Sequence, residues 1–403
     1  MALIVQKFGG TSVGDADRIR EVADHVGRTV RRGNQVVLVV SAMGKETDEL
    51  LRLASDVARN RTGREMDMLI TAGERKAIAL VAMAIADQGI EAISFTGSQA
   101  GFITDTDHMN AKILEVRADR LREALAANRV PVVAGAQGVS TERDVTFLGR
   151  GGSDTTAVAI AHALQADICE LYTDVSGVFS ADPRLVPRAR RMAEISFDDL
   201  LEMTATGCPK PAMRSVEFAR SYNVPLHIRS AFTWEPGTLV KEQISVEQAS
   251  VIAVTHDTSE AKVTVLGVAD KPGVAALLFR RLADRGINVD MIVQNVSDRS
   301  QTDISFTVPA ESYDVAIGVC EDARGAVGAQ AVNGDPGVGK VSIIGSGMKT
   351  DPGVAARMFE TLADQGVNIE MISTSPIRTS CVVARSDVER AVQALHTAFG
   401  LDI

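Results

Sequence analysis

A glycine pair beside a lysine, close to the amino terminus, carries residue types that bind phosphate. Lys7-Phe-Gly-Gly-Thr-Ser12 follows an apolar run and precedes a helical pattern, so Gly9 and Gly10 are predicted to form a strand-to-helix turn. Glycines let backbone N–H groups approach an anion, the start of a helix favours negative charge, and Lys7 adds a full positive charge. Paired glycines are more often simply a tight turn, so this segment indicates an anion site only in combination with others.

A second glycine-rich segment, Leu148-Gly-Arg-Gly-Gly-Ser-Asp-Thr-Thr156, joins a turn to an apolar helical pattern over 157–166. Arg150 offers a planar guanidinium that binds a carboxylate or a phosphate with two hydrogen bonds. Ser153 or Asp154 could cap the helix, and the alternative interpretation is that Asp154 does no more than that.

A third polar loop, at 172–184, follows another apolar run. Open α/β sheets bind ligands at the carboxyl ends of their strands, where such loops gather. The sequence contains neither GxxxxGK[ST] nor a GxGxxG that follows a strand. The three loops together predict a nucleotide and a small anionic co-substrate that lie across one edge of a sheet.

Apolar β-branched runs alternate with helical patterns through residue 240, which predicts an α/β sandwich with a mainly parallel sheet. Helices are predicted over 15–32 and within 47–87. Strands are predicted at 2–5, 36–40, 92–95, 130–134, 168–172 and 226–228. We therefore assign residues 1–240 to a catalytic domain.

An internal repeat dominates the remainder of the chain. Residues 272–292 return as residues 352–372, with 13 of 21 positions identical. Each copy reads as strand, Pro-Gly turn, helix, Gly-Asn turn and strand, which predicts a duplicated ferredoxin-like βαββαβ unit. The expected boundaries are a linker at 241–258, a first unit at 259–334 and a second at 335–403.

Composition limits the classes of partner. The 42 Lys and Arg against 52 Asp and Glu give a net charge of −10, the wrong sign for a protein that binds nucleic acid or an anionic membrane. The four cysteines lie far apart without CxxC, so neither a zinc site nor a disulfide framework is indicated. No signal-peptide pattern opens the sequence, and we expect a cytoplasmic protein.

The three loops, together with Ser41-Ala-Met-Gly44 and Leu69-Ile-Thr-Ala-Gly-Glu-Arg75, closely resemble aspartokinases of the amino-acid kinase superfamily, most of all the actinobacterial type. The duplicated carboxyl-terminal unit resembles their paired ACT domains. The resemblance implies ATP-dependent phosphorylation of L-aspartate to 4-phospho-L-aspartate, on the route to lysine, threonine and methionine. Because the substrate is already a carboxylate anion, positioning and charge stabilisation matter more than a general base.

The resemblance also implies residue roles. Lys7 and Asp154 would be catalytic, with Lys7 stabilising the transition state, Asp154 orienting the cations, and Mg²⁺ bridging the ATP phosphates. Further ATP contacts would come from Gly9, Gly10, Ser41, Thr173, Asp174, Ser180, Asp182, Arg184 and Lys210. Aspartate would be held by Thr47, Glu74, Arg150, Gly151, Gly152 and Ser153, with Arg150 on a carboxylate and Glu74 on the ammonium.

One segment departs from the family pattern. Gly207-Cys-Pro-Lys-Pro211 places its lysine one position later than usual and between two prolines, which favour extended backbone at Cys208 and Lys210. We expect Lys210 to reach ATP along a different backbone path. The alternative is a catalytically weak amino-acid sensor whose kinase domain binds ATP without efficient turnover.

The repeated unit implies an effector site for lysine or threonine. Free N–H groups at the Pro-Gly turn could accept an amino-acid carboxylate. The candidate residues are Asp270, Pro272, Gly273, Asn288, Asp290 and Gln294. In the second copy, Pro376 stands where the family commonly has an acidic residue, so we expect weakened feedback. ACT units also imply a homo-oligomer, and some relatives make a separate small subunit.

Overall fold

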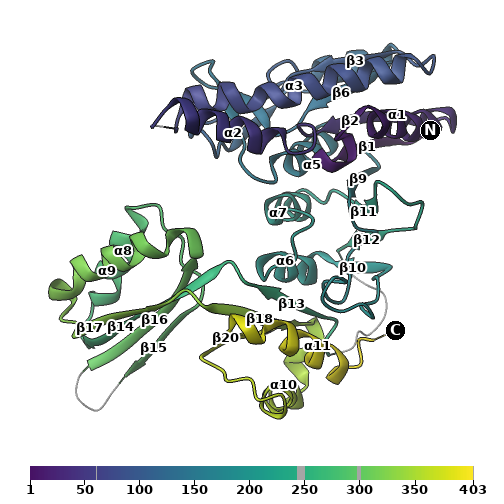
Figure 1. The fold of residues 1–403 in the computed structure, drawn as a ribbon. Coiled ribbons are helices and arrows are strands. Elements are labelled where there is room, and N and C mark those ends of the chain that lie inside the picture. The colour runs from purple at the N-terminus through teal and green to yellow at the C-terminus, as the bar shows by residue number, and fades with distance from the viewer. Residues whose placement is uncertain (60, 243–249, 297–300, 403) are drawn as a thin grey trace. The chain divides into compact units, whose positions relative to one another are not determined.

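The computed structural model describes residues 1–59, 61–242, 250–296 and 301–402. The chain forms two compact units. We call the first the kinase unit; it comprises Met1–Val178, Arg191–Thr204 and the chain from Pro209 to residue 242. The second, the regulatory unit, comprises Phe179–Arg190, Ala205–Cys208 and the chain from residue 250 onward. Figure 1 follows the chain through both units.

An eight-stranded sheet forms the centre of the kinase unit, in the order β10-β12-β11-β9-β1-β2-β6-β3. All neighbouring strands are parallel except β11 and β12, which confirms the predicted α/β class. The strands are β1 (Leu3–Phe8), β2 (Gln35–Val40), β3 (Ala92–Phe95), β6 (Val130–Ala134), β9 (Ile168–Thr173), β10 (Glu194–Ser196), β11 (Leu226–Ser230) and β12 (Thr238–Lys241).

Helices and a smaller sheet complete this unit. The small sheet contains β4 (Phe102–Thr104), β5 (Ile113–Val116), β7 (Gln137–Ser140) and β8 (Val145–Phe147). The helices are α1 (Ala16–Arg31), α2 (Glu46–Val57), α3 (Arg64–Ala86), α4 (Asp119–Ala126), α5 (Gly152–Leu164), α6 (Phe197–Ala205) and α7 (Met213–Ser221), with a 3₁₀ turn η1 (Gly10–Val13) before α1. The region predicted as helical over 47–87 is therefore two helices, and α3 begins after Gly63, whose φ of 83° favours glycine.

Apolar periodicity explains how these helices cover the sheet. Ile19 and Val26 of α1 and Val81 of α3 are buried in one cluster with Leu38 and Val132 of the sheet. Helix α5, by contrast, is buried for nearly its whole length, from Gly152 to Ala161. A helix buried on all sides holds its amino-terminal residues rigidly, which matters because that end carries Ser153 and Asp154.

The first regulatory sheet is the predicted ferredoxin-like unit. It runs β14 (Glu260–Ala269), α8 (Val274–Ala283), β15 (Ile292–Val296), β16 (Gln301–Pro309), α9 (Tyr313–Val327) and β17 (Ala331–Asp335), with the 3₁₀ turn η2 (Ala310–Ser312). Its strands are antiparallel in the order β15-β16-β14-β17.

The second regulatory sheet corrects the predicted domain boundaries. It contains β18 (Val338–Ile344), α10 (Gly353–Asp364), β19 (Met371–Ser375), β20 (Arg378–Ala384) and α11 (Val388–Ala398), with the 3₁₀ turns η3 (Ser346–Thr350) and η4 (Arg385–Asp387). Its fourth strand is β13 (Ala253–Asp257), which precedes the first copy in sequence and pairs antiparallel with β18. The prediction of a linker at 241–258 is therefore wrong for 253–257, and residues 243–249 lie outside the described ranges.

Two lysines at equivalent positions of the repeat connect the two copies. Lys262 of the first copy binds Glu370 of the second at 2.6 Å, and Lys340 of the second binds Asp290 of the first at 2.5 Å. Lys340 is buried and also contacts Glu260. Burial lowers the pKa of Lys340, but the two carboxylates more than offset it and leave the pKa above its usual value.

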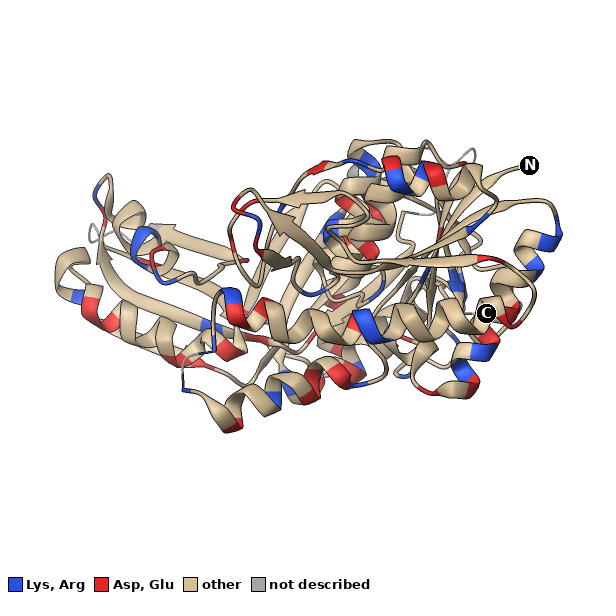
Figure 2. Ribbon diagram, turned by 90° about the horizontal axis from the view of Figure 1, so that it is seen from above, with Lys and Arg blue, Asp and Glu red and all other residues tan. Residues whose placement is uncertain are grey.

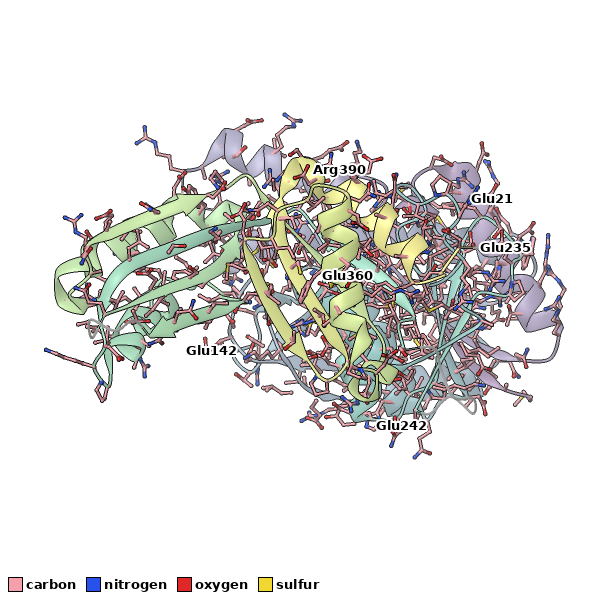
Figure 3. The ribbon with its side chains drawn as sticks, turned by 90° about the horizontal axis from the view of Figure 1, so that it is seen from below. Glu21, Glu142, Glu235, Glu242, Glu360 and Arg390 are labelled. Carbon is pink, nitrogen blue, oxygen red and sulfur yellow. The ribbon has the colours of Figure 1, made fainter. Side chains whose placement is uncertain are left out.

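Charge is distributed in mixed sign over the exposed helices. Figure 2 shows acidic and basic residues interspersed along them, and Figure 3 shows Glu21, Glu360 and Arg390 among the side chains at the surface. In the described ranges, none of the helices combines the length and apolarity that crossing a bilayer requires.

Candidate functional site

Lys7 and Asp154 form a buried ion pair at the carboxyl end of β1. Lys7 Nζ lies 2.6 Å from Asp154 Oδ1, and the side chains are 8% and 7% exposed. The Ala212 N–H donates to Asp154 Oδ2 at 3.1 Å. Burial raises the pKa of Asp154, but the charge and hydrogen bond of Lys7 outweigh it, so the pKa lies below its usual value. Asp154 therefore does more than cap α5, because its carboxylate binds both Lys7 and the Ala212 N–H.

The glycine turn after β1 packs tightly against neighbouring backbone. A Cβ on Gly10 would lie 2.7 Å from the Ala42 carbonyl oxygen, whereas a Cβ on Gly9 would meet Lys7 Nζ at 3.5 Å. The lysine ammonium therefore lies directly beside Gly9. The turn continues into η1, and α1 begins later with Asp15 accepting a hydrogen bond from the Arg18 N–H. The helix that begins at the glycine turn is thus the 3₁₀ helix η1, with Gly9 as its N-cap, and α1 begins only after Asp15.

The start of α5 lies beside Lys7 through the ion pair of Asp154. Gly151 precedes α5 with φ 73°, and a Cβ there would lie 2.3 Å from the Ala212 Cβ. Gly152 is equally confined, since a Cβ would lie 2.8 Å from that of Ala136. Ser153 Oγ accepts a hydrogen bond from Ser41 Oγ at 3.0 Å, which joins the loop after β2 to this helix.

Glu74 is a buried carboxylate with an unpaired oxygen. It is 3% exposed, and Oε2 has no hydrogen-bond partner. Burial raises its pKa to about 7, although backbone hydrogen bonds, one of them from Ala42, lower it. Ala42 also lies beside Gly10, so Glu74 and the glycine turn after β1 both adjoin this one residue. A buried carboxylate of this kind is suited to receive a cation.

The other candidates in the kinase unit differ in their exposure and in their contacts. Thr173 ends β9 beside β1 and donates to Asp174 Oδ1 at 2.9 Å. Lys210 is exposed, and its charge contributes to the lowered pKa of Asp154, which places it near the ion pair. Thr47 is half-buried in the first turn of α2. Arg150 is exposed, with no hydrogen-bond or ion-pair partner among the described residues.

Three predicted nucleotide residues belong to the regulatory unit. Asp182 and Arg184 pair with each other at 2.6 Å. Ser180 is fully buried, and its hydroxyl contacts His396 Nε2 at 2.8 Å. The prediction that the Ser180 side chain lines the nucleotide is therefore wrong, because the hydroxyl is buried and is hydrogen-bonded to His396.

A cavity of about 330 Å³ lies at the first Pro-Gly turn of the repeat. Its lining includes four of the predicted effector residues, Asp270, Pro272, Gly273 and Gln294, but neither Asn288 nor Asp290. Asp290 instead binds Lys340. The cavity is therefore lined by the first Pro-Gly turn and by Gln294 of β15, whereas Asp290 contacts the second copy of the repeat.

Asp67, which the sequence reasoning missed, organises the approach to the second glycine-rich segment. This fully buried residue of α3 accepts hydrogen bonds from the Met109 N–H at 2.9 Å and the Phe147 N–H at 3.0 Å, and contacts His108 Nδ1 at 2.7 Å. Arg214 donates to the Leu148 carbonyl at 2.7 Å. An aspartate on the apolar face of a helix was the available signal, since a buried charge needs partners.

The comparisons with known proteins identify the family. Residues 2–230 match the amino acid kinase family, and residues 262–323 and 341–399 match the ACT domain. The chain is 53% identical to "Aspartokinase" of Mycolicibacterium smegmatis and 53% identical to that of Corynebacterium glutamicum, each over 100% of this chain and 97% of the relative. The chain belongs to the aspartokinase family. It is a kinase, as predicted.

A solved structure shows the same fold. E. coli aspartokinase III, in complex with aspartate and ADP, superposes with a TM-score of 0.85 at 23% identity, covering 98% of this chain and 99% of that one. The predicted combination of an amino-acid kinase sandwich with two ACT domains is confirmed.

The two glycines of the turn after β1, Gly9 and Gly10, should differ in their tolerance of a methyl group in this aspartokinase. We expect Gly10→Ala to lower the free energy of unfolding by about 1–3 kcal/mol, because the clash is with backbone that cannot move away. The matched Gly9→Ala variant meets an ordinary contact and should keep the melting temperature of the unaltered protein. Thermal denaturation measures both, and equal melting temperatures for the two variants would contradict the geometry.

Proposed function

We propose that this aspartokinase transfers the γ-phosphoryl group of ATP to the side-chain carboxylate of L-aspartate, giving 4-phospho-L-aspartate, the first step towards the aspartate-derived amino acids. The observation that carries the proposal is the Lys7–Asp154 pair beside the glycine turn, with the unpaired Glu74 carboxylate near the same turn. The aspartate and ADP bound to E. coli aspartokinase III support the choice of substrates.

The step itself follows from the charges. A side-chain carboxylate oxygen of aspartate attacks the γ-phosphorus, and the bond from that phosphorus to the β,γ-bridging oxygen breaks to release ADP. No proton leaves the attacking group, so the site needs to bring two anions together and stabilise the transferring phosphoryl group. Lys7 supplies the positive charge, while Asp154 holds its ammonium in place beside Gly9.

The aspartate end of the site uses different residues. Glu74, once ionised, receives the substrate ammonium, and Arg150 has its guanidinium available for a carboxylate. Ser41, Thr47 and Ser153 offer hydroxyl contacts. Each of these groups fixes the substrate orientation, which supplies much of the rate enhancement when the reacting groups are both anions.

Mg²⁺ enters this proposal with the nucleotide. The described residues contain no group of three or more His, Cys, Asp and Glu side chains that could hold a metal ion. Asp154 already binds Lys7, so phosphate oxygens are the main ligands that we assign to Mg²⁺. When bound, the ion neutralises phosphate charge. The charge of Lys210 lowers the pKa of Asp154, which supports a place for this lysine near the ion pair; turnover is what separates an active kinase from a sensor that only binds ATP.

A hydroxylamine trap tests the reaction directly, because hydroxylamine converts an acyl phosphate into a coloured hydroxamate. With MgATP and L-aspartate, we expect hydroxamate that requires aspartate, and a loss of at least about 10²-fold in the Lys7→Ala variant, since the transferring charge then has no fixed cation. Lys45→Ala, which removes an exposed lysine before α2, is the matched control. A folded, ATP-binding protein that forms no hydroxamate would overturn the proposal.

The raised pKa of Glu74 predicts a pH dependence of aspartate binding. Below about pH 7 this carboxyl is protonated and cannot pair with an ammonium, so the KM for aspartate should fall about tenfold from about pH 6 to about pH 8. The stability of the ligand-free protein depends on the same group, but it decreases over the pH range in which aspartate binding improves. The ligand-free protein loses stability as pH rises from 4.5 towards about 7, because the folded state holds a proton that the unfolded chain releases.

Glu74→Gln is the control for this pH dependence. The amide does not titrate, so its KM for aspartate should be raised and nearly constant over the same range. A KM in the unaltered enzyme that is equally constant would show that Glu74 does not receive the ammonium.

We further propose that the cavity at Asp270–Gly273 binds an amino-acid effector, in keeping with the lysine bound to another structure of E. coli aspartokinase III.

Pro376 lies exposed between β19 and β20, where it contributes neither a charge nor an N–H. We therefore expect weak inhibition by lysine and threonine, added separately or together, and stronger inhibition in Pro376→Glu. Gln294→Ala, which alters the cavity wall, should reduce the inhibition that remains. Potent joint inhibition of the unaltered enzyme would contradict this expectation.

A further inference from the structure

A second buried carboxylate with an unpaired oxygen lies near Glu74, within the kinase unit. Glu46 is in the first turn of α2, which packs against α3, the helix of Glu74 (Figure 1). A Cβ on Gly73, the residue before Glu74, would lie 3.5 Å from the Glu46 Cδ. Oε2 of Glu46 and Oε2 of Glu74 are both buried without a hydrogen-bond partner. Each helix therefore contributes one unpaired carboxylate oxygen to the same contact.

The ion pair of Glu46 accounts for its other oxygen only. Lys76 Nζ lies 2.6 Å from Glu46 Oε1, and the Lys76 side chain is 51% exposed, whereas that of Glu46 is 19% exposed. An exposed cation on Oε1 does not satisfy Oε2, which is withdrawn from water and gains no hydrogen bond in exchange. The ion pair with Lys76 therefore does not explain why this carboxylate is buried.

The position of Glu46 in α2 does not explain its burial either. An acidic residue in the first turn of a helix is stabilised by the helix dipole, and that alone is the simplest role for Glu46. Asp48 and Glu49 lie in the same turn, however, and both are exposed. They provide the same favourable charge without the cost of desolvation. The burial of Glu46 beside Glu74 therefore points to a cationic ligand.

A primary ammonium group fits this pair of carboxylates. It carries one positive charge and three N–H donors, so two carboxylate oxygens on separate helices can each accept one hydrogen bond. A divalent metal ion fits less well, because it takes six or more oxygen ligands and the described residues contain no cluster of three or more acidic, histidine or cysteine side chains suited to a metal. Thr47, the next residue of α2, is half-buried and offers a hydroxyl to the same ligand.

We propose that Glu46 is a second ligand of the substrate ammonium, so that the amino group of L-aspartate binds between the Glu46 and Glu74 carboxylates. The proposal rests on the proposed function, in which Glu74 receives that ammonium. It makes Glu46 a specificity-determining residue. A dicarboxylic acid without an amino group leaves two buried carboxylates unpaired in the complex, and its binding is penalised by both.

The same pair connects aspartate binding to a proton. Two neighbouring carboxylates repel each other when both are ionised, and the charge of Glu46 contributes to the raised pKa of Glu74. In the free enzyme near neutral pH, Glu74 holds a proton, which leaves to solvent when the substrate ammonium takes its place. The charged groups at the pair have opposite effects: removing Glu46 lowers the pKa of Glu74, whereas removing Lys76, which balances Glu46, raises it.

The experiment measures the KM for aspartate between about pH 6 and about pH 8.5. At about pH 8, Glu46→Gln should raise this KM about tenfold, the effect of losing one charged hydrogen bond, with less than a twofold change in the KM for ATP. The pH at which the KM for aspartate changes should move down in Glu46→Gln and up in Lys76→Met. A purely structural defect does not shift the two profiles in opposite directions.

Succinate, which is aspartate without its amino group, separates binding of the ammonium from the shape of the site. As a competitor of aspartate, succinate should bind weakly to the unaltered enzyme. Its inhibition constant should stay the same or fall in Glu46→Gln, because succinate has no ammonium to lose and one buried charge has been removed. An equal loss of affinity for aspartate and succinate would overturn the proposal, since Glu46 would then only maintain the site.

Glu49→Gln is the matched control. It makes the same chemical change in the same turn of α2, but at an exposed side chain, so both KM values and the pH profile should stay constant. If Glu46→Gln does not fold, Lys76→Met decides the question, because Lys76 is half exposed. A Lys76→Met profile that does not move would then overturn the role of Glu46.

The outcomes distinguish this inference from the function on which it rests. An unaltered enzyme that forms no aspartyl hydroxamate overturns the proposed function. An active enzyme in which Glu74→Gln raises the KM for aspartate, while a folded Glu46→Gln keeps both that KM and its pH dependence, overturns the second ligand alone.

Discussion

The ion pair between Lys7 and Asp154 is the interaction on which the kinase site depends. Both charged groups are more than nine-tenths buried, and the charge of Lys7 outweighs the burial that would otherwise raise the pKa of Asp154. Lys7 is the last but one residue of β1 and Asp154 lies in the first turn of α5, so the pair connects the strand before the glycine turn to the start of a largely buried helix. The Ala212 N–H, on the same carboxylate, ties the segment after Lys210 to this centre.

The pKa values of two buried carboxyl groups, Asp154 and Glu74, are shifted in opposite directions because their surroundings differ. Asp154 has a permanent cation at 2.6 Å, which keeps it ionised despite burial. Glu74 has no such cation and keeps one oxygen unpaired, so burial raises its pKa. Asp154 therefore has its partners in the protein itself, whereas Glu74 keeps an oxygen that, in the proposed function, the substrate ammonium would pair with.

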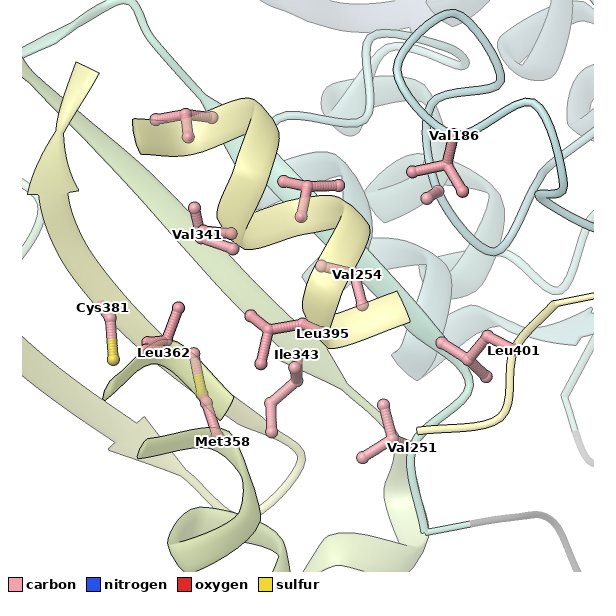
Figure 4. Packing of buried hydrophobic residues seen from close by; sticks show 14 of the residues in the cluster. Val186, Val251, Val254, Val341, Ile343, Met358, Leu362, Cys381, Leu395 and Leu401 are labelled. Carbon is pink, nitrogen blue, oxygen red and sulfur yellow. The ribbon is translucent and has the colours of Figure 1, made fainter. Parts of the chain in front are cut away.

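In the regulatory unit, the two copies of the repeat are interleaved and do not simply follow one another along the chain. Strand β13, which precedes the first copy, completes the sheet of the second, and Lys262 and Lys340 each bind a carboxylate of the opposite copy. The segment Phe179–Arg190 packs into the core of the second copy (Figure 4), where the Ser180 hydroxyl contacts His396. Parts of the chain that are distant in sequence therefore share one hydrophobic core.

The sequence by itself determined the fold class, the two glycine-rich turns and the duplicated unit. These features are local, since Gly10 and Gly151 are set by backbone geometry and the strands of 36–40 and 130–134 by continuous apolar runs. Only the tertiary structure decided that Asp154 binds Lys7, that Ser180 turns into a core, and that 253–257 forms a strand of a later copy. Those outcomes depend on which distant segments pack together, and a short sequence pattern does not show which distant segment it will contact.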